Sequence, residues 1–151
     1  MVLSTRYSRA RELSFQQLLN TRVGELDLRP SGTLRDCLIG LLRELKANHI
    51  AFYPRFYFGQ EPWGCIDRTG SVEIPFYLAN NELRRIAERH QVSYSKEEIM
   101  MILRHETGHA INYAYKMWIG DHWKRLFGKF RAPYPRYYNY ISNSKDFVRY
   151  L

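Results

Sequence analysis

The sequence has few cysteines, no long apolar run and no repeated or low-complexity segment. Cys37 and Cys65 stand in different segments without CxxC spacing, so neither a redox motif nor a cysteine-based zinc site is predicted, and both are interpreted as core thiols. No apolar stretch approaches the roughly 20 residues that span a bilayer, so we do not expect a membrane protein. Residues 1–15 carry arginines where a secretory signal needs an unbroken apolar stretch, which predicts a cytoplasmic protein.

Acidic residues are scarce in the last third of the chain. The formal net charge is +8, and residues 104–151 hold 9 Lys and Arg against 3 Asp and Glu, whereas residues 1–103 hold 14 against 12. Aromatic residues are interleaved with these cations, which is typical of a surface that binds single-stranded nucleic acid. A missing acidic partner segment would give the same imbalance. No recognition-module sequence accompanies the charge, so nucleic acid ranks last among the expected partners.

The length and composition fit one globular domain over residues 1–151. The chain has a mass of 18.1 kDa, with 45% hydrophobic and 25% charged residues, enough to bury a core without disulfide or metal support. Hydrophobic periodicity and turn residues predict helices over residues 12–20, 33–47, about 81–90 and 95–120, and a shorter one from residue 121. Strands are predicted over residues 25–28, 50–58 and 71–78.

Prolines occur in both of the longer predicted strands, Pro54 in the first and Pro75 in the second. Proline cannot donate to a β ladder, so it favours an edge strand or the end of a strand. We therefore expect an α+β fold in which a small sheet, edged by the strands at residues 51–58 and 71–78, packs on the helix at residues 95–120. The strand order is open.

The helix expected over residues 95–120 has the clearest start signal. Ser95 and Glu98 have the spacing of a capping box, in which the serine accepts from the amide of Glu98 and the glutamate reaches back. Apolar residues occur on most sides of this helix, and Gly120 marks its end. The pattern predicts a long helix at the centre of the fold.

An HExxH motif lies inside this helix at residues 105–109. Histidines one turn apart project from the same face of a helix, about 6 Å apart, and their imidazoles can converge on one tetrahedral zinc ion. His105 and His109 are therefore the candidate metal ligands. Glu106, beside the pair, is the candidate general base that takes a proton from zinc-activated water. Small residues within and after the motif leave room for another backbone or a substrate.

A third ligand is not evident, although a catalytic zinc usually takes three from the protein. The carboxylates and histidines after the motif are Asp121, His122 and Asp146. Each of them is interpreted as a helix cap or a surface group. Asp121 and His122 follow the helix by one short turn, so binding of the same metal by either of them stays an alternative, although the turn leaves little room.

The alternative is that the motif residues belong to an ordinary helix. In that case His105 and His109 are surface or core histidines, and Glu106 pairs with Arg104 or Lys116. The upstream histidines, His49 and His90, lie near the ends of elements and are not expected to bind metal.

Five stretches of the sequence resemble a family of bacterial zinc-binding metallopeptidases that carry HExxH. They are Ile74–Ala79, Ile102–Ala110, Trp123–Lys129, Pro133–Pro135 and Phe147–Val148. The resemblance covers most of the chain and implies a zincin-like α+β fold with a long central HExxH helix. Members of the family continue past the position of Leu151 into an acidic helix whose glutamate looks like the third zinc ligand. The resemblance therefore implies a truncated member of that family.

Likeness to zincins also implies two substrate contacts. The strand near Ile74–Leu78 would border the cleft and pair with an extended peptide. A tyrosine near the C-terminus would steady the oxyanion, the candidates being Tyr134, Tyr137, Tyr138 and Tyr140. The other interpretation is that these tyrosines only cover neighbouring helices.

Three functions follow, in order of preference. The first is a zinc-dependent metallopeptidase that acts on a peptide or protein substrate, with Zn²⁺ on His105 and His109 and with Glu106 as general base. The second is a catalytically incomplete zinc-binding or protein-interaction module. The third is a basic nucleic-acid-binding domain, whose affinity would fall steeply with salt and survive chelation. The sequence leaves the cleavage specificity and the oligomeric state open.

Overall fold

The computed structural model describes residues 14–60, 62–66, 69–79 and 81–130. The chain divides into two compact units, Met1–Lys116 and Met117–Leu151, and each is described by itself. The prediction of a single domain over residues 1–151 stays a prediction. No helix within the described ranges is long and apolar enough to cross a membrane.

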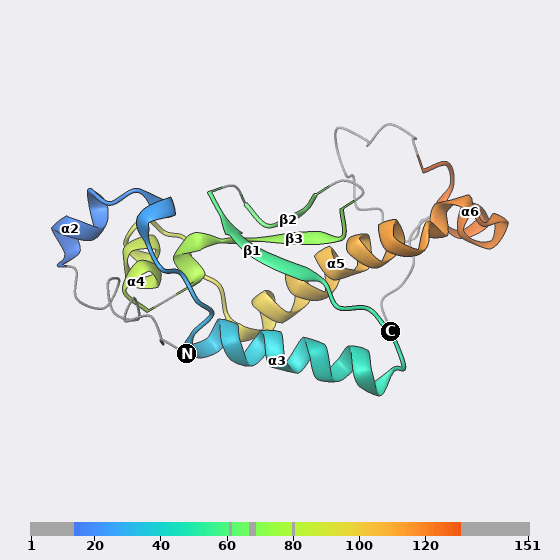
Figure 1. Ribbon diagram of the computed structural model, residues 1–151, viewed down its shortest axis with the longest axis horizontal. Helices are drawn as coiled ribbons and strands as arrows, with labels where there is room; N and C mark the ends of the chain where they lie inside the picture. Colours follow the sequence, from blue (N-terminus) through green and yellow to red (C-terminus); the bar gives the residue numbers. More distant parts are fainter. Residues whose placement is uncertain (1–13, 61, 67–68, 80, 131–151) are drawn as a thin grey trace, which may run out of the picture. The chain divides into compact units, whose positions relative to one another are not determined.

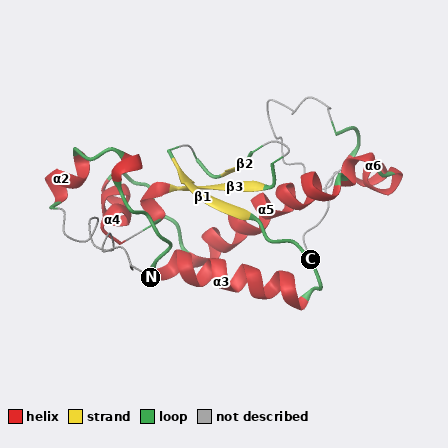
Figure 2. Cartoon of the chain, in the orientation of Figure 1, coloured by secondary structure: helices red, strands yellow, loops and turns green. Residues whose placement is uncertain are grey.

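The described residues form an α+β structure, as predicted (Figure 1 and Figure 2). The α-helices are α2 (Phe15–Leu19), α3 (Gly32–Ala47), α4 (Asn81–Arg89), α5 (Lys96–Tyr115) and α6 (Asp121–Phe127). Short 3-10 helices lie at Val23–Glu25 (η1), Phe76–Leu78 (η2) and Met117–Ile119 (η3). The strands are β1 (Arg55–Gly59), β2 (Gly64–Cys65) and β3 (Ser71–Pro75).

The core of the first unit lies between α3, α5 and one face of the sheet (Figure 1). The stripe predicted for α3 is confirmed, because five apolar residues at helical spacing are buried: Leu34, Cys37, Leu38, Leu41 and Leu45. They pack in one cluster with Ile74 of β3 and with Ile99 and Leu103 of α5. Burial of Cys37 confirms its prediction as a core thiol and raises the pKa of that thiol through desolvation. Cys65 is half-buried, and neither cysteine forms a disulfide.

The sheet has the strand order β1-β3-β2, with β1 parallel and β2 antiparallel to β3. The prediction that both strands lie at edges is right for β1 and wrong for β3, which is the middle strand. The alternative drawn from Pro75, a strand end, is confirmed, because Pro75 is the last residue of β3 and the chain turns into η2 directly after it. The sheet also includes β2, a two-residue strand that was not predicted.

The predicted contact between Ile74–Leu78 and an extended peptide is wrong for Phe76–Leu78, which form a 3-10 helix and not a strand. It stays a prediction for Ile74 and Pro75. β1 pairs with all of β3, whereas β2 pairs only with Val72 and Glu73, so no described strand pairs with Ile74 or Pro75 on the side of β2. A peptide added as a further strand needs such a free edge.

The strand predicted over residues 25–28 is also wrong. Val23–Glu25 is a 3-10 helix, and Leu26 is buried in a small cluster with Leu18 of α2 and Leu83 of α4. Leu28 packs at the margin of the same cluster. The alternation of Leu26 and Leu28 therefore reflects packing of a loop between helices, not pairing in a sheet.

The start of α5 agrees with the prediction, and its end does not. Ser95 Oγ accepts from the amide of Glu98 at 3.1 Å, and Glu98 Oε2 accepts from the amide of Ser95 at 2.8 Å. The helix was expected to reach Gly120 but stops at Tyr115, because Lys116 takes the left-handed conformation with φ 51° and ψ 40°. A left-handed residue cannot continue a right-handed helix, and η3 follows.

In the second unit the described residues contain η3 and α6. The short helix expected from Asp121 is confirmed. The ring of Phe130 stacks on Trp118 with centroids 4.7 Å apart, and it forms a T-shaped pair with Trp123 with centroids 5.9 Å apart. The cations Lys124, Arg125 and Lys129 are exposed.

Removal of the α5 cap tests how much the start of this helix contributes. We expect Ser95→Ala to lower the free energy of unfolding by about 1 kcal/mol, because the amide of Glu98 loses its acceptor. Urea denaturation measures the change. Ser93→Ala, at an exposed serine outside the helix, is the matched control and should stay within about 0.5 kcal/mol of the wild type. Equal stability of the two variants would contradict a role for the cap.

A tyrosine–glutamate pair lies on the face of the sheet opposite to the core. Tyr57 and Glu73 are direct neighbours on β1 and β3, and the Tyr57 hydroxyl donates to Glu73 Oε2 at 2.7 Å. Desolvation, with a smaller contribution from this hydrogen bond, raises the pKa of Tyr57 from 10.0 to about 12.

This pair predicts a loss of stability at alkaline pH. Because the pKa is higher in the folded state, the folded protein holds the phenol proton more tightly than the unfolded chain. The stabilisation is complete below pH 10.0 and is lost as the pH rises to about 12. We expect Tyr57→Phe to make this decline shallower in urea denaturation across that range. Tyr53→Phe, at a tyrosine that is 73% exposed, should decline like the wild type, and an unchanged slope in Tyr57→Phe would refute the assignment.

Candidate metal centre

His105 and His109 lie in the C-terminal half of α5, on the side that faces away from the core. His105 is exposed, whereas Glu106 and His109 are half-buried. The opposite face of α5 is buried at Ile99, Leu103, Thr107 and Ala110. α5 carries apolar residues on most sides, as expected, but not all of these sides are buried, since Met101 is 61% exposed. One buried face fixes the rotation of the helix, and the histidines therefore point away from the core.

The two histidine rings converge. Nε2 of His105 and Nε2 of His109 lie 3.1 Å apart, and the rings are nearly perpendicular at 86°. Two nitrogens that bind one tetrahedral zinc at 2.0–2.1 Å stand about 3.3–3.4 Å apart. The two donors therefore fit a shared zinc ion with a small adjustment of the rings. The same distance also suits a hydrogen bond between neutral imidazoles, one donating and one accepting.

Glu106 forms no ion pair within the part of the chain that the structure describes. Arg104, one of the two cations considered as its partner, instead forms a two-pronged hydrogen bond with Glu44 of α3, at 2.9 and 2.6 Å. This hydrogen bond lowers the pKa of Glu44 and raises that of Arg104. The fork ties α5 to α3 at the residue directly before His105, while the Glu106 carboxylate is left without an ion pair to Arg104.

The small residues of the motif have different surroundings. Thr107 and Ala110 are buried in the core. Gly108 is exposed, and a Cβ added to it would meet no described atom within 4 Å beyond its own helix and neighbours. Gly108 is therefore not needed for packing within the described residues and leaves open space beside the histidines, as expected.

Two polar atoms of α5 are buried without a hydrogen-bond partner among the described residues. They are Thr107 Oγ1, on the core side, and Asn112 Oδ1. Asn112 lies one turn after His109 and two turns after His105, on the same face of the helix. Asn112 was not among the site residues predicted from the sequence. Its helical spacing from both histidines was the available signal.

Among the described residues, the structure brings no third ligand to the histidine pair. Across residues 14–60, 62–66, 69–79 and 81–130, no group of three His, Cys, Asp or Glu side chains stands close enough to hold a metal ion. Asp121 and His122 belong to the second unit, where Asp121 pairs with Lys124 at 3.3 Å. Asp146 and the tyrosines considered for the oxyanion lie outside the described residues. His49 and His90 are exposed, as expected for histidines at the ends of elements.

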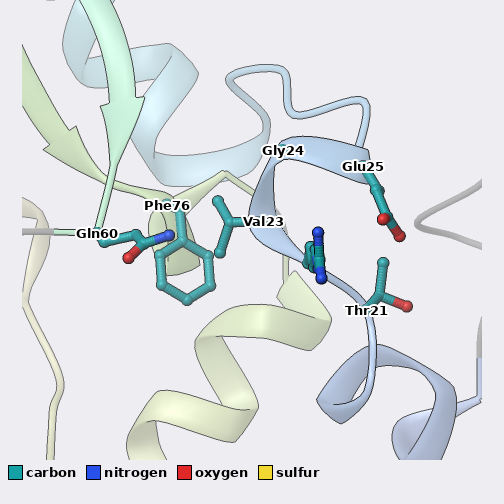
Figure 3. Close-up of a pocket in the computed structure, with 7 residues that line it drawn as sticks. Thr21, Val23, Gly24, Glu25, Gln60 and Phe76 are labelled. Atoms are coloured by element: carbon teal, nitrogen blue, oxygen red, sulfur yellow. The ribbon is translucent and has the colours of Figure 1, made fainter.

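A surface pocket lies elsewhere in the first unit, around η1 (Figure 3). Val23 and Phe76 line its apolar part, whereas Arg22, Glu25 and Gln60 are polar. Its described lining contains no histidine or cysteine and none of the motif residues. The pocket therefore contributes nothing to the candidate metal centre.

Comparisons of the chain with protein-family models, with curated proteins and with solved structures found no match.

The open space at Gly108 gives a test of the helix itself. We expect Gly108→Ala to raise the free energy of unfolding by about 0.5–1 kcal/mol, because alanine loses less backbone entropy than glycine in a helix and meets no neighbour here. Urea denaturation measures the change. The reverse substitution at an exposed alanine of the same helix, Ala114→Gly, should lower stability by a similar amount. A destabilised Gly108→Ala would show that the space is filled in the folded protein.

Proposed function

We propose that the chain is a zinc-binding metallopeptidase domain, in which His105 and His109 hold Zn²⁺ and Glu106 is the general base. The supporting observation is the convergence of the two Nε2 atoms, 3.1 Å apart, on a helix whose rotation is fixed by its buried face. The resemblance of five stretches to HExxH metallopeptidases points the same way and supports a zincin-like fold and a peptide or protein substrate.

The proposed chemistry assigns one role to each residue. Bound zinc would lower the pKa of a coordinated water and polarise the carbonyl of the peptide bond. The Glu106 carboxylate accepts a proton from the attacking water as the carbon–oxygen bond forms. Glu106 then donates this proton to the amide nitrogen as the carbon–nitrogen bond breaks, so it returns to its ionised form. His105 and His109 remain neutral, because an imidazole must keep a lone pair to bind a metal.

Half-burial of Glu106 suits this role. A carboxylate beside the ligand pair, with no ion pair to Arg104, keeps both oxygens available to a water molecule. The exposure of His105 and the open space at Gly108 leave the site accessible from solvent. A Cβ at the position of Gly108 would meet no described side chain within 4 Å.

Metal content and hydrolysis test the proposal together. Elemental analysis should find about one zinc per chain, and His105→Ala should lose it because one of two histidine ligands is removed. Glu106→Gln should keep the zinc but cleave an unfolded protein substrate about 10²–10⁴-fold more slowly, since the amide cannot accept a proton. His90→Ala removes an exposed histidine outside the motif and should match the wild type in both measurements.

The other candidate functions predict different results. Zinc at one per chain without hydrolysis would contradict the peptidase and leave a zinc-binding module. Absence of zinc from the wild type would refute both. Binding of single-stranded DNA that weakens steeply with salt and survives a chelator would instead support the basic nucleic-acid-binding domain.

A further inference from the structure

Asn112 presents an acceptor that the described part of the chain does not use. Its Oδ1 atom is buried, and the structure gives it no hydrogen-bond partner among the described residues. A buried polar atom without a partner loses its hydration and gains nothing in return. Such an atom in a native protein calls for a specific explanation, and one explanation is a donor that becomes available only when the protein binds its ligand.

The two histidines, in turn, need acceptors for their ring N–H groups when they bind a metal. Because the two Nε2 atoms face each other, zinc would be bound through Nε2, and Nδ1 of each ring would then carry the proton. A metal-binding histidine almost always donates this second N–H to an acceptor, which fixes the tautomer and the ring orientation. Within the described residues the structure gives His105 and His109 a ring hydrogen bond only to each other.

The helix places the acceptor near one of these donors. Asn112 follows His109 by one turn on the same face, and side chains of a helix lean toward its N-terminus. The Asn112 amide therefore leans toward the turn that contains Gly108 and His109. Gly108, the other residue one turn before Asn112, has no side chain, and a Cβ built there meets no described atom within 4 Å.

We propose that Asn112 is a positioning residue of the metal centre, whose side-chain oxygen accepts the Nδ1–H of His109 and holds the His109 ring with Nε2 toward zinc. This inference rests on the proposed zinc site. Asn112 does not touch the metal or the substrate in this role and acts through His109.

Zinc titration of the full chain by calorimetry, beside urea denaturation of the metal-free protein, tests the assignment. Asn112→Ala should bind Zn²⁺ about 10–100-fold more weakly, yet unfold at the same or a higher urea concentration than the wild type, because an unsatisfied acceptor is gone. Asn112→Asp keeps an oxygen acceptor and should restore zinc affinity to within a few-fold. Thr107→Val removes the other unpartnered oxygen of α5, on the core side, and should leave zinc affinity unchanged.

The signal of the His109 Nδ1–H in nitrogen-15 NMR spectra gives a second readout. In the zinc-bound wild type this proton should exchange slowly with water, and in Asn112→Ala it should exchange rapidly. Unchanged zinc affinity and exchange in Asn112→Ala would overturn the role of Asn112 and leave the metallopeptidase proposal intact. A metal-free Asn112→Ala protein that is unfolded, or an equal loss of affinity in Thr107→Val, would show a structural role and overturn it as well. A wild type that binds no zinc would overturn both.

Discussion

The burial of one face of α5 is the constraint on which the candidate site depends. Ile99 and Leu103 are 0% exposed and pack with Leu41 of α3 and Ile74 of β3. Full burial of one such side chain contributes about 1.5–3 kcal/mol. A rotation of α5 about its axis would expose several of them at once, so the helix has one stable orientation. The histidine face is set by this packing, although neither histidine takes part in it.

The two-pronged hydrogen bond between Arg104 and Glu44, at the protein surface, also restricts the orientation of α5. Two charge-assisted hydrogen bonds in one plane restrict the angle between α5 and α3 more than a single ion pair does. Both side chains are about half exposed, so their contribution to stability is small beside that of the core. The fork occupies Arg104, which would otherwise be a cation available to Glu106.

Sequence reasoning was accurate where the signal is local. The stripe of α3, the capping box at Ser95 and the short helix α6 depend on residues within a few positions of one another, and all three are present. It failed where a distant segment decides. The alternation at residues 25–28 looks like a strand, but Leu26 packs between helices. The middle position of β3 depends on β2, whose two residues carry no periodic signal.

The candidate site shows the same division between features that local sequence determines and features that distant segments determine. The sequence alone determined that His105, Glu106 and His109 occupy one region of a helix, because the spacing of HExxH matches the helical repeat. Only the tertiary structure decided that the Nε2 atoms converge and that Arg104 is held by Glu44. It also decided that no described atom fills the space at Gly108 and that Asn112 Oδ1 has no hydrogen-bond partner among the described residues. Helical spacing fixes the direction of a side chain from the backbone alone, whereas burial and hydrogen bonding depend on atoms that other segments bring to the same place.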